Sequence, residues 1–149
     1  MSTDSSHRPR LEPGLSAHFE SEVRREWTIA HYDPRLPAVL STPAMIGMME
    51  TAAARAVDPA IPVGKLTVGT KIEVDHSRAV ACGAHIVATA KLTEVQCRFL
   101  IFEVEARCAD QLIGHGRVTR AIVDYARFGR MATGENPSPS NGPTVLILF

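Results

Sequence analysis

One apolar segment, which opens at Thr42 and closes before Pro59, constrains this chain more than any other feature. Threonine is a common helix N-cap, and the proline at position 43 suits the first helical turn, where its missing N–H leaves no hydrogen bond unmade. Pro59 disfavours helical backbone at the residue before it and so predicts the end of the helix. A helix is therefore predicted from residue 43 onward, with apolar side chains at four-residue spacing: Met45, Met49, Ala53 and Val57.

The segments after this helix change to a period of two. Residues 66–76, 83–95, 97–108 and 111–124 are rich in valine, isoleucine and threonine, which predicts four strands. The short breaks between them favour an antiparallel meander over crossover connections. In the first of these strands we expect one face to hold every second residue: Leu66, Val68, Thr70, Ile72, Val74 and His76.

The segment before the helix completes the expected architecture. Residues 15–30 alternate in part and predict a further strand, and residues 31–40 contain two prolines and predict a loop. A helix that is apolar on most sides must be enclosed. We therefore expect an α+β fold, in which a curved antiparallel sheet of about five strands wraps a long central helix.

One domain accounts for most of the chain, because 149 residues suffice for a single core. We expect it to span residues 15–124, after a flexible N-terminus at 1–14. Residues 125–149 are expected to form a partly disordered tail, rich in glycine, proline, serine and asparagine before an apolar end whose role stays open.

Composition excludes several classes of function. The net charge is zero, with 16 basic and 16 acidic residues, which argues against nucleic-acid binding. No apolar stretch reaches the roughly 18 residues that a membrane helix needs, and the N-terminus lacks the apolar core of a signal peptide. The three cysteines form no paired motif, so we expect no disulfide framework and no metal site. Free thiols fit a reducing cytoplasm.

Three residues on the helix and the following strand carry the groups that acyl transfer needs: the hydroxyl of Thr42, the carboxylate of Glu50 and the imidazole of His76. Thr42 is either a nucleophile, a residue that positions water, or only a helix cap. Glu50 either orients His76, acts as a base on water, or lies on a solvated face. A carboxylate in an apolar helix requires an explanation, because burying a charge is costly.

Other candidates have plainer interpretations. His85 and His115 lie inside alternating strands, where packing or surface roles are expected. The methionines at 45, 48 and 49 are expected to fill the core or a dimer interface, and the cysteines at 82, 97 and 108 to be inert core thiols.

Four motifs occur together in this chain: Ser41-Thr42-Pro43, Glu50, Val68-Gly69-Thr70-Lys71-Ile72-Glu73-Val74-Asp75-His76-Ser77 and Gly114-His115-Gly116-Arg117-Val118-Thr119-Arg120. Together they resemble those of the hot-dog-fold acyl-CoA thioesterases, in the branch typified by fluoroacetyl-CoA thioesterase. The resemblance covers roughly residues 16–124. It implies a homodimer or larger oligomer that binds acyl-CoA, with CoA present only as part of the substrate and no other cofactor. It also implies catalytic roles for Thr42, Glu50 and His76.

The same resemblance implies substrate-binding residues. Gly69, Thr70 and Arg120 match positions at the site, with Gly69 beside the thioester oxygen. Glycine permits such a close approach by its backbone N–H. In the lid segment that precedes the helix, Tyr32 and Leu36 are the candidate acyl contacts.

This chain departs from the family in the lid, residues 31–37. Asp33 and Leu36 stand where the fluoroacetyl-specific enzyme carries phenylalanines. The sequence therefore predicts an acyl group larger than fluoroacetyl or otherwise different from it.

Two other functions fit the same residues. One is a non-catalytic hot-dog module that binds acyl-CoA or a small ligand. The other is a hot-dog enoyl-CoA hydratase, for which Asp75 next to His76 is the indication.

The dimer has a physical argument of its own. A single curled sheet leaves a strand edge exposed, and two-fold pairing of such edges would cover it. The active site would then lie at the subunit junction, with residues from both chains.

Overall fold

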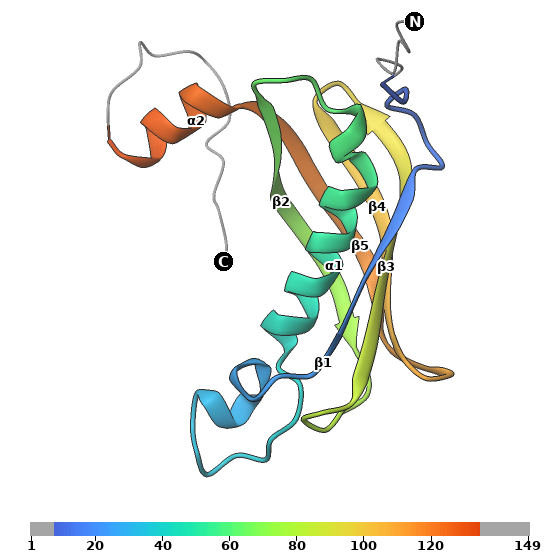
Figure 1. The fold of residues 1–149 in the computed structure, drawn as a ribbon, viewed down its shortest axis with the longest axis vertical. Coiled ribbons are helices and arrows are strands. Elements are labelled where there is room, and N and C mark those ends of the chain that lie inside the picture. The colour runs from blue at the N-terminus through green and yellow to red at the C-terminus, as the bar shows by residue number, and fades with distance from the viewer. Residues whose placement is uncertain (1–7, 135–149) are drawn as a thin grey trace, which may run out of the picture.

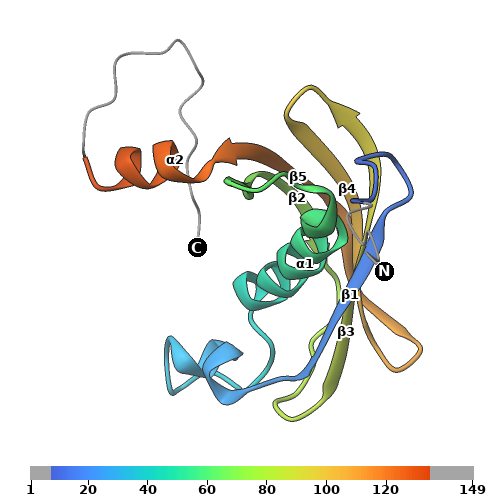
Figure 2. The ribbon, with the colours of Figure 1, turned by 45° about the horizontal axis from the view of Figure 1, so that its top comes forward.

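A single long helix lies across the inner face of a curved sheet (Figures 1 and 2). This computed structural model describes residues 8–134. The sheet has five antiparallel strands in the order β1-β3-β4-β5-β2. The central helix and the antiparallel sheet of five strands confirm the predicted fold. The elements are β1 (Ser16–Glu22), α1 (Thr42–Val57), β2 (Lys65–His76), β3 (His85–Gln96), β4 (Phe99–Cys108), β5 (Gln111–Asp124) and α2 (Tyr125–Ala132).

The core forms where α1 packs against the sheet, above all against β1 and β3. Met45 and Met49 are fully buried and Met48 is nearly so, which confirms that the methionines fill the core. From the sheet side, the largest fully buried side chains are Ile86, Leu92, Leu100, Phe102, Ile113 and Val118.

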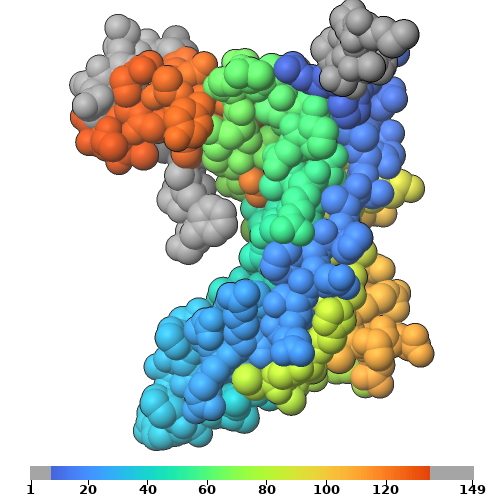
Figure 3. Space-filling view, viewed as in Figure 1, coloured from blue at the N-terminus to red at the C-terminus, as the bar shows by residue number. Residues whose placement is uncertain are grey.

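The strand predicted for residues 15–30 is too long. After β1 ends at Glu22, the chain forms two 3-10 turns, η1 (Arg25–Trp27) and η2 (Ile29–His31). The N–H of Thr28 donates to the carbonyl oxygen of Arg25, and the N–H of Tyr32 donates to that of Ile29. Residues 25–41 form a lobe beyond the start of α1, which extends below the body of the molecule in Figure 3. A bridge from Thr28 to Leu40 closes this lobe, and a bridge from Val39 to Ala81 holds it to the domain.

The chain after β5 contains a helix that the sequence analysis assigned to the tail. Asp124 caps α2, because its Oδ1 accepts a hydrogen bond of 3.0 Å from the backbone N–H of Arg127. This helix projects from the domain (Figure 1). Residues 1–7 of the expected flexible N-terminus, and 135–149 with the apolar end, lie outside the described residues.

A β-bulge in β2 corrects the predicted face of that strand. Gly69 lies opposite Arg120 and Lys71 lies opposite Thr119, so Thr70 is an extra residue. The inserted residue shifts the alternation of side chains by one. Leu66 and Val68 therefore do not share a face with the later residues; the positions that face α1 are Thr67, Gly69, Ile72, Val74 and His76.

The helix also begins differently from the prediction. α1 ends at Val57 as expected, followed by the turn η3 (Asp58–Ala60), but its N-cap is Ser41 and not Thr42. The Ser41 hydroxyl accepts a hydrogen bond of 3.3 Å from the backbone N–H of Ala44. Thr42 is consequently the first helical residue, and its hydroxyl is not needed for capping.

Replacing Ser41 by alanine is expected to lower the free energy of unfolding by about 1 kcal/mol, because the N–H of Ala44 loses its acceptor. Thr42→Ala is the matched control and should cost less, since that hydroxyl caps nothing. Urea unfolding of the two variants measures the difference. A larger loss in Thr42→Ala than in Ser41→Ala would show that the cap is assigned to the wrong residue.

Candidate active site

The hydroxyl of Thr42 and the imidazole of His76 meet where α1 begins and β2 ends. Thr42 Oγ1 lies 2.8 Å from His76 Nδ1, and His76 Nε2 lies 3.1 Å from the carbonyl oxygen of Arg78. Thr42 is exposed and His76 is half-buried, so the pair is open to a substrate. We call these two residues the hydroxyl–imidazole pair.

The two hydrogen bonds of His76 determine the direction in which a proton can move. A backbone carbonyl only accepts, so in the neutral ring Nε2 carries the hydrogen and donates to Arg78. Nδ1 is then the acceptor, and the Thr42 hydroxyl donates to it. A hydroxyl that donates to an oriented imidazole is the arrangement of a nucleophile with its base. The orienting group is the main chain of Arg78, which no sequence pattern indicates.

Glu50 lies in a second, buried group of polar residues. Its Oε2 accepts a hydrogen bond of 2.7 Å from Arg120 Nη1, and the two side chains are only 9% and 7% exposed. The other carboxylate oxygen, Oε1, is buried and has no hydrogen-bond partner among the described residues. Burial raises the pKa of Glu50, and the charge of Arg120 opposes that rise. The interpretation of Glu50 as a solvated surface residue is therefore wrong.

Arg120 is held on its other side by Thr67. Its Nε donates to Thr67 Oγ1 at 3.0 Å, and its Nη2 donates to the carbonyl oxygen of Thr67 at 2.8 Å. Thr67 could not be predicted from the sequence, because threonine is common in strands and no neighbouring motif marks this one. A substrate contact for Arg120 stays a prediction, since its observed partners are Glu50 and Thr67.

Gly69 lies against the carboxylate of Glu50. A Cβ atom at this position would overlap Glu50 Oε2, so only glycine lets the carboxylate approach β2. Thr70 is the exposed bulge residue, and its hydroxyl donates to the carbonyl oxygen of Thr119 at 3.2 Å. Its proposed contact with substrate, like that of Gly69, stays a prediction. We call Glu50, Thr67, Gly69 and Arg120 the carboxylate cluster.

In one chain the hydroxyl–imidazole pair and the carboxylate cluster lie far apart. Thr42 and Glu50 are eight residues apart on α1, a rise of about 12 Å. Gly69 and His76 are seven residues apart on β2, about 23 Å along an extended strand. Glu50 therefore does not orient His76 of the same chain, and that interpretation of Glu50 is wrong for a single chain.

The two lid candidates lie in the lobe of residues 25–41, beyond the Thr42 end of α1 (Figure 3). Tyr32 is 68% exposed and Leu36 is 43% exposed. Between them, Asp33 forms an ion pair of 2.7 Å with Arg35. The lobe thus lies beside the hydroxyl–imidazole pair, and the side chains of the two lid candidates, Tyr32 and Leu36, face solvent. Their contact with an acyl group stays a prediction.

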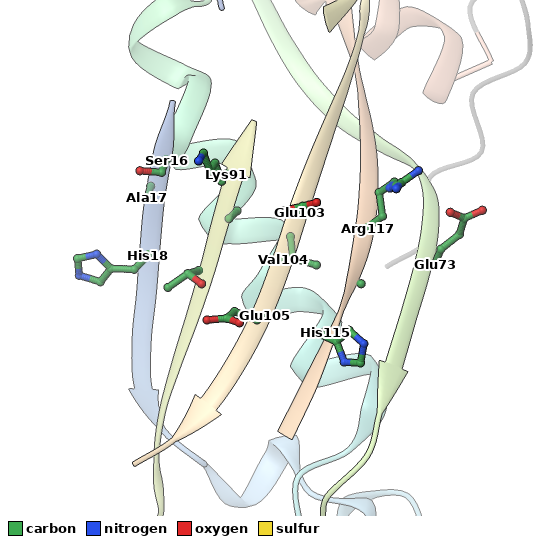
Figure 4. A pocket seen from close by; sticks show the side chains of 13 residues that line it. Ser16, Ala17, His18, Glu73, Lys91, Glu103, Val104, Glu105, His115 and Arg117 are labelled. Atoms are coloured by element: carbon green, nitrogen blue, oxygen red, sulfur yellow. The ribbon is translucent and has the colours of Figure 1, made fainter. Parts of the chain in front are cut away.

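A hollow of about 900 Å³ lies on the opposite side of the sheet from α1 (Figure 4). No predicted catalytic residue lines it. Its lining is mostly charged or polar and includes His18, Lys91, Glu105, His115 and Arg117. Such side chains are typical of the solvated face of an antiparallel sheet, so we do not place the chemistry there.

His85 and His115 lie at the surface, and so do two of the three cysteines. His115 is exposed, and exposed His85 lies 3.2 Å from Glu20, which confirms surface roles for both histidines. The prediction of core thiols is wrong for Cys82 and Cys97, which are exposed, whereas Cys108 is partly buried and packs against the core. Within residues 8–134 we find no group of three residues suited to hold a metal ion. No helix in the same range is long and apolar enough to cross a membrane.

Known proteins share this fold and much of this sequence. A family model described as fluoroacetyl-CoA-specific thioesterase matches residues 23–126. The fluoroacetyl-CoA thioesterase of Streptantibioticus cattleyicolor is 32% identical over 117 residues, which cover 74% of this chain and 84% of that protein.

Solved structures agree with these matches. A structure of the fluoroacetyl-CoA thioesterase has a TM-score of 0.79 at 29% identity and covers 87% of this chain and 100% of that chain. A thioesterase superfamily member from Thermus thermophilus has a TM-score of 0.77 at 25% identity, covering 85% and 93%. A hot-dog-like protein from Thermanaerovibrio acidaminovorans, at 18% identity and a TM-score of 0.75, shares the fold.

Proposed function

The chain belongs to the family of fluoroacetyl-CoA-specific thioesterases, and we propose that it hydrolyses its substrate at a site shared by two copies of itself. It is a thioester hydrolase with the hot-dog fold, acting on acyl-CoA to give a free acid and CoA. The hydroxyl–imidazole pair of Thr42 and His76 supports this activity directly.

One observation supports a site shared by two subunits. The carboxylate cluster and the hydroxyl–imidazole pair each have a residue on the edge strand β2, Gly69 and His76, and these two residues are seven positions apart. Among the residues that the structure describes, β2 has a neighbouring strand on one side only, so within residues 8–134 its other edge is open to pairing. Two-fold pairing of β2 with the same strand of a second copy is antiparallel. The His76 end of each strand would then lie beside the Gly69 end of the other. Each hydroxyl–imidazole pair would thus meet the carboxylate cluster of the partner subunit, twice per dimer.

The first chemical step follows from the hydrogen bonds of the pair. Thr42 Oγ1 attacks the thioester carbonyl carbon, and its proton passes to His76 Nδ1. The carbon–sulfur bond breaks, and the departing thiolate takes the proton from His76 to leave as free CoA. The acyl group remains as an ester on Thr42.

The second step removes the acyl group with water. The free Oε1 of Glu50 of the partner subunit takes one proton from water, and the hydroxide attacks the ester carbon. The Thr42 oxygen departs and receives the proton of the newly formed acid by way of His76. Glu50 releases its proton to solvent, and the product leaves as a carboxylate. This scheme calls on no metal and no cofactor beyond the CoA of the substrate.

The alternative of a hydratase depended on Asp75 next to His76. Adjacent residues of a strand point to opposite faces, and Asp75 is exposed opposite His115 on the outer side of the sheet. The two side chains therefore form no catalytic pair. We place the enzyme in the cytoplasm, a proposal supported by the free thiols of its three cysteines.

Thiol release from a panel of acyl-CoAs tests the activity and its selectivity. The panel runs from acetyl and fluoroacetyl to long-chain and aryl esters. We expect turnover of at least one ester. Because Asp33 is tied to Arg35 and Leu36 replaces an aromatic lid residue, we expect kcat/KM for fluoroacetyl-CoA to exceed that for acetyl-CoA by less than about tenfold. A much larger preference would contradict the argument from the lid, and no turnover of any ester would contradict the thioesterase.

A further inference from the structure

The guanidinium of Arg120 binds Glu50 through a single hydrogen bond, although arginine and carboxylate groups commonly form two parallel ones. The cause is visible in its other contacts. Thr67 occupies Nε with its side-chain oxygen and Nη2 with its carbonyl oxygen, so one residue accepts along a whole edge of the guanidinium. The remaining nitrogen, Nη1, reaches only Oε2 of Glu50.

We propose that Thr67 is a positioning residue, which holds Arg120 so that Glu50 keeps one oxygen paired and the other free to act as the base. This inference rests on the proposed function, in which Oε1 of Glu50 takes a proton from water. The observation that points to it is the hydrogen bonding of the carboxylate. Oε2 accepts from Arg120 at 2.7 Å, whereas Oε1 is buried and has no partner within residues 8–134.

The arrangement matters because these residues are buried. As whole residues, Thr67 is 7% exposed and Arg120 is 5% exposed. A donor that loses its acceptor here therefore has little access to water. If the Thr67 hydroxyl were removed, the N–H at Nε of Arg120 would need another acceptor. Without the bond to that hydroxyl the guanidinium can turn toward Glu50, its ion-pair partner, and donate to both carboxylate oxygens. A carboxylate that accepts from Arg120 with both oxygens is a poorer base for water.

The test compares Thr67→Val, which keeps the shape but removes the hydroxyl, with Thr67→Ser, which keeps the hydroxyl. The control is Thr93→Val on β3, an exposed threonine whose hydroxyl donates to the carbonyl oxygen of Ile101 at 3.1 Å. The substrate is acetyl-CoA or benzoyl-CoA, whichever the native enzyme hydrolyses faster. We expect kcat of Thr67→Val to fall by at least about tenfold with KM within about twofold. Thr67→Ser and Thr93→Val should match the native enzyme.

Two outcomes would overturn the inference. The first is a native kcat in Thr67→Val together with an inactive Glu50→Gln enzyme. This result would keep Glu50 as the base and show that Thr67 does not position it. The second is an equal loss in Thr67→Val and Thr67→Ser that follows a drop in melting temperature, which shows a structural role only. An active Glu50→Gln enzyme would instead overturn the proposed function itself, because the base would then be another group.

Discussion

Replacing Glu50 by glutamine is expected to stop the enzyme after one acyl transfer. The steady-state kcat should fall by about 10³-fold, because glutamine cannot take the proton from water. The first step uses Thr42 and His76 and should survive, so one equivalent of CoA per site is released in a burst. The acyl group then stays on Thr42. Rapid-quench measurement of CoA release and the intact mass of the protein detect the burst and the adduct.

His76→Ala is the matched comparison, because it removes the base of the first step. It should show an equal loss of kcat without any burst. A melting curve for Glu50→Gln is needed as well, since this change leaves the buried charge of Arg120 without its counter-charge. A folded Glu50→Gln enzyme with neither burst nor adduct would exclude the acyl-enzyme and favour direct attack of water on the thioester.

Mixed dimers of two inactive variants are expected to regain activity. In a dimer of one His76→Ala chain and one Glu50→Gln chain, the intact hydroxyl–imidazole pair of the second chain meets the intact carboxylate cluster of the first. The other site carries both defects. Two tags on co-expressed chains allow the mixed dimer to be purified, and its activity should be about half that of the native dimer, from one working site of two.

The parent homodimers, each with two defective sites, are the controls and should stay inactive. Light scattering at micromolar concentration measures the oligomeric state of the native protein, and a dimer is the expected result. A mixed dimer as inactive as its parents would show that each site belongs to one chain. A monomer in solution with full activity would contradict the pairing of β2 with a second copy.

The type and order of the elements could be predicted because the signals are local. Proline at position 43 and at position 59 bracket α1, and the spacing of Met45 and Met49 matches a helical face. The four later strands lie within two residues of their predicted bounds, since alternation is visible along each segment separately. The prediction was wrong for residues 23–30, where the alternation was partial and local turns satisfy the backbone.

The residues of the site were predictable as chemical types but not in their arrangement. Thr42, Glu50 and His76 could be singled out as a hydroxyl, a carboxylate and an imidazole, and their catalytic roles stay predictions. The pairing of Thr42 with His76 spans 34 residues and that of Glu50 with Arg120 spans 70, so no local pattern records either.

The sequence by itself determined a helix wrapped by an antiparallel sheet, because helical and strand periods depend on neighbours along the chain. Only the tertiary structure decided that Ser41 caps the helix and leaves Thr42 for His76, although both residues are suitable caps. It also decided the bulge at Thr70, without which Gly69 and His76, seven residues apart, would face opposite sides of the sheet. The register of β2 and the partner of Glu50 are both set by β5, and β5 comes from a distant part of the sequence.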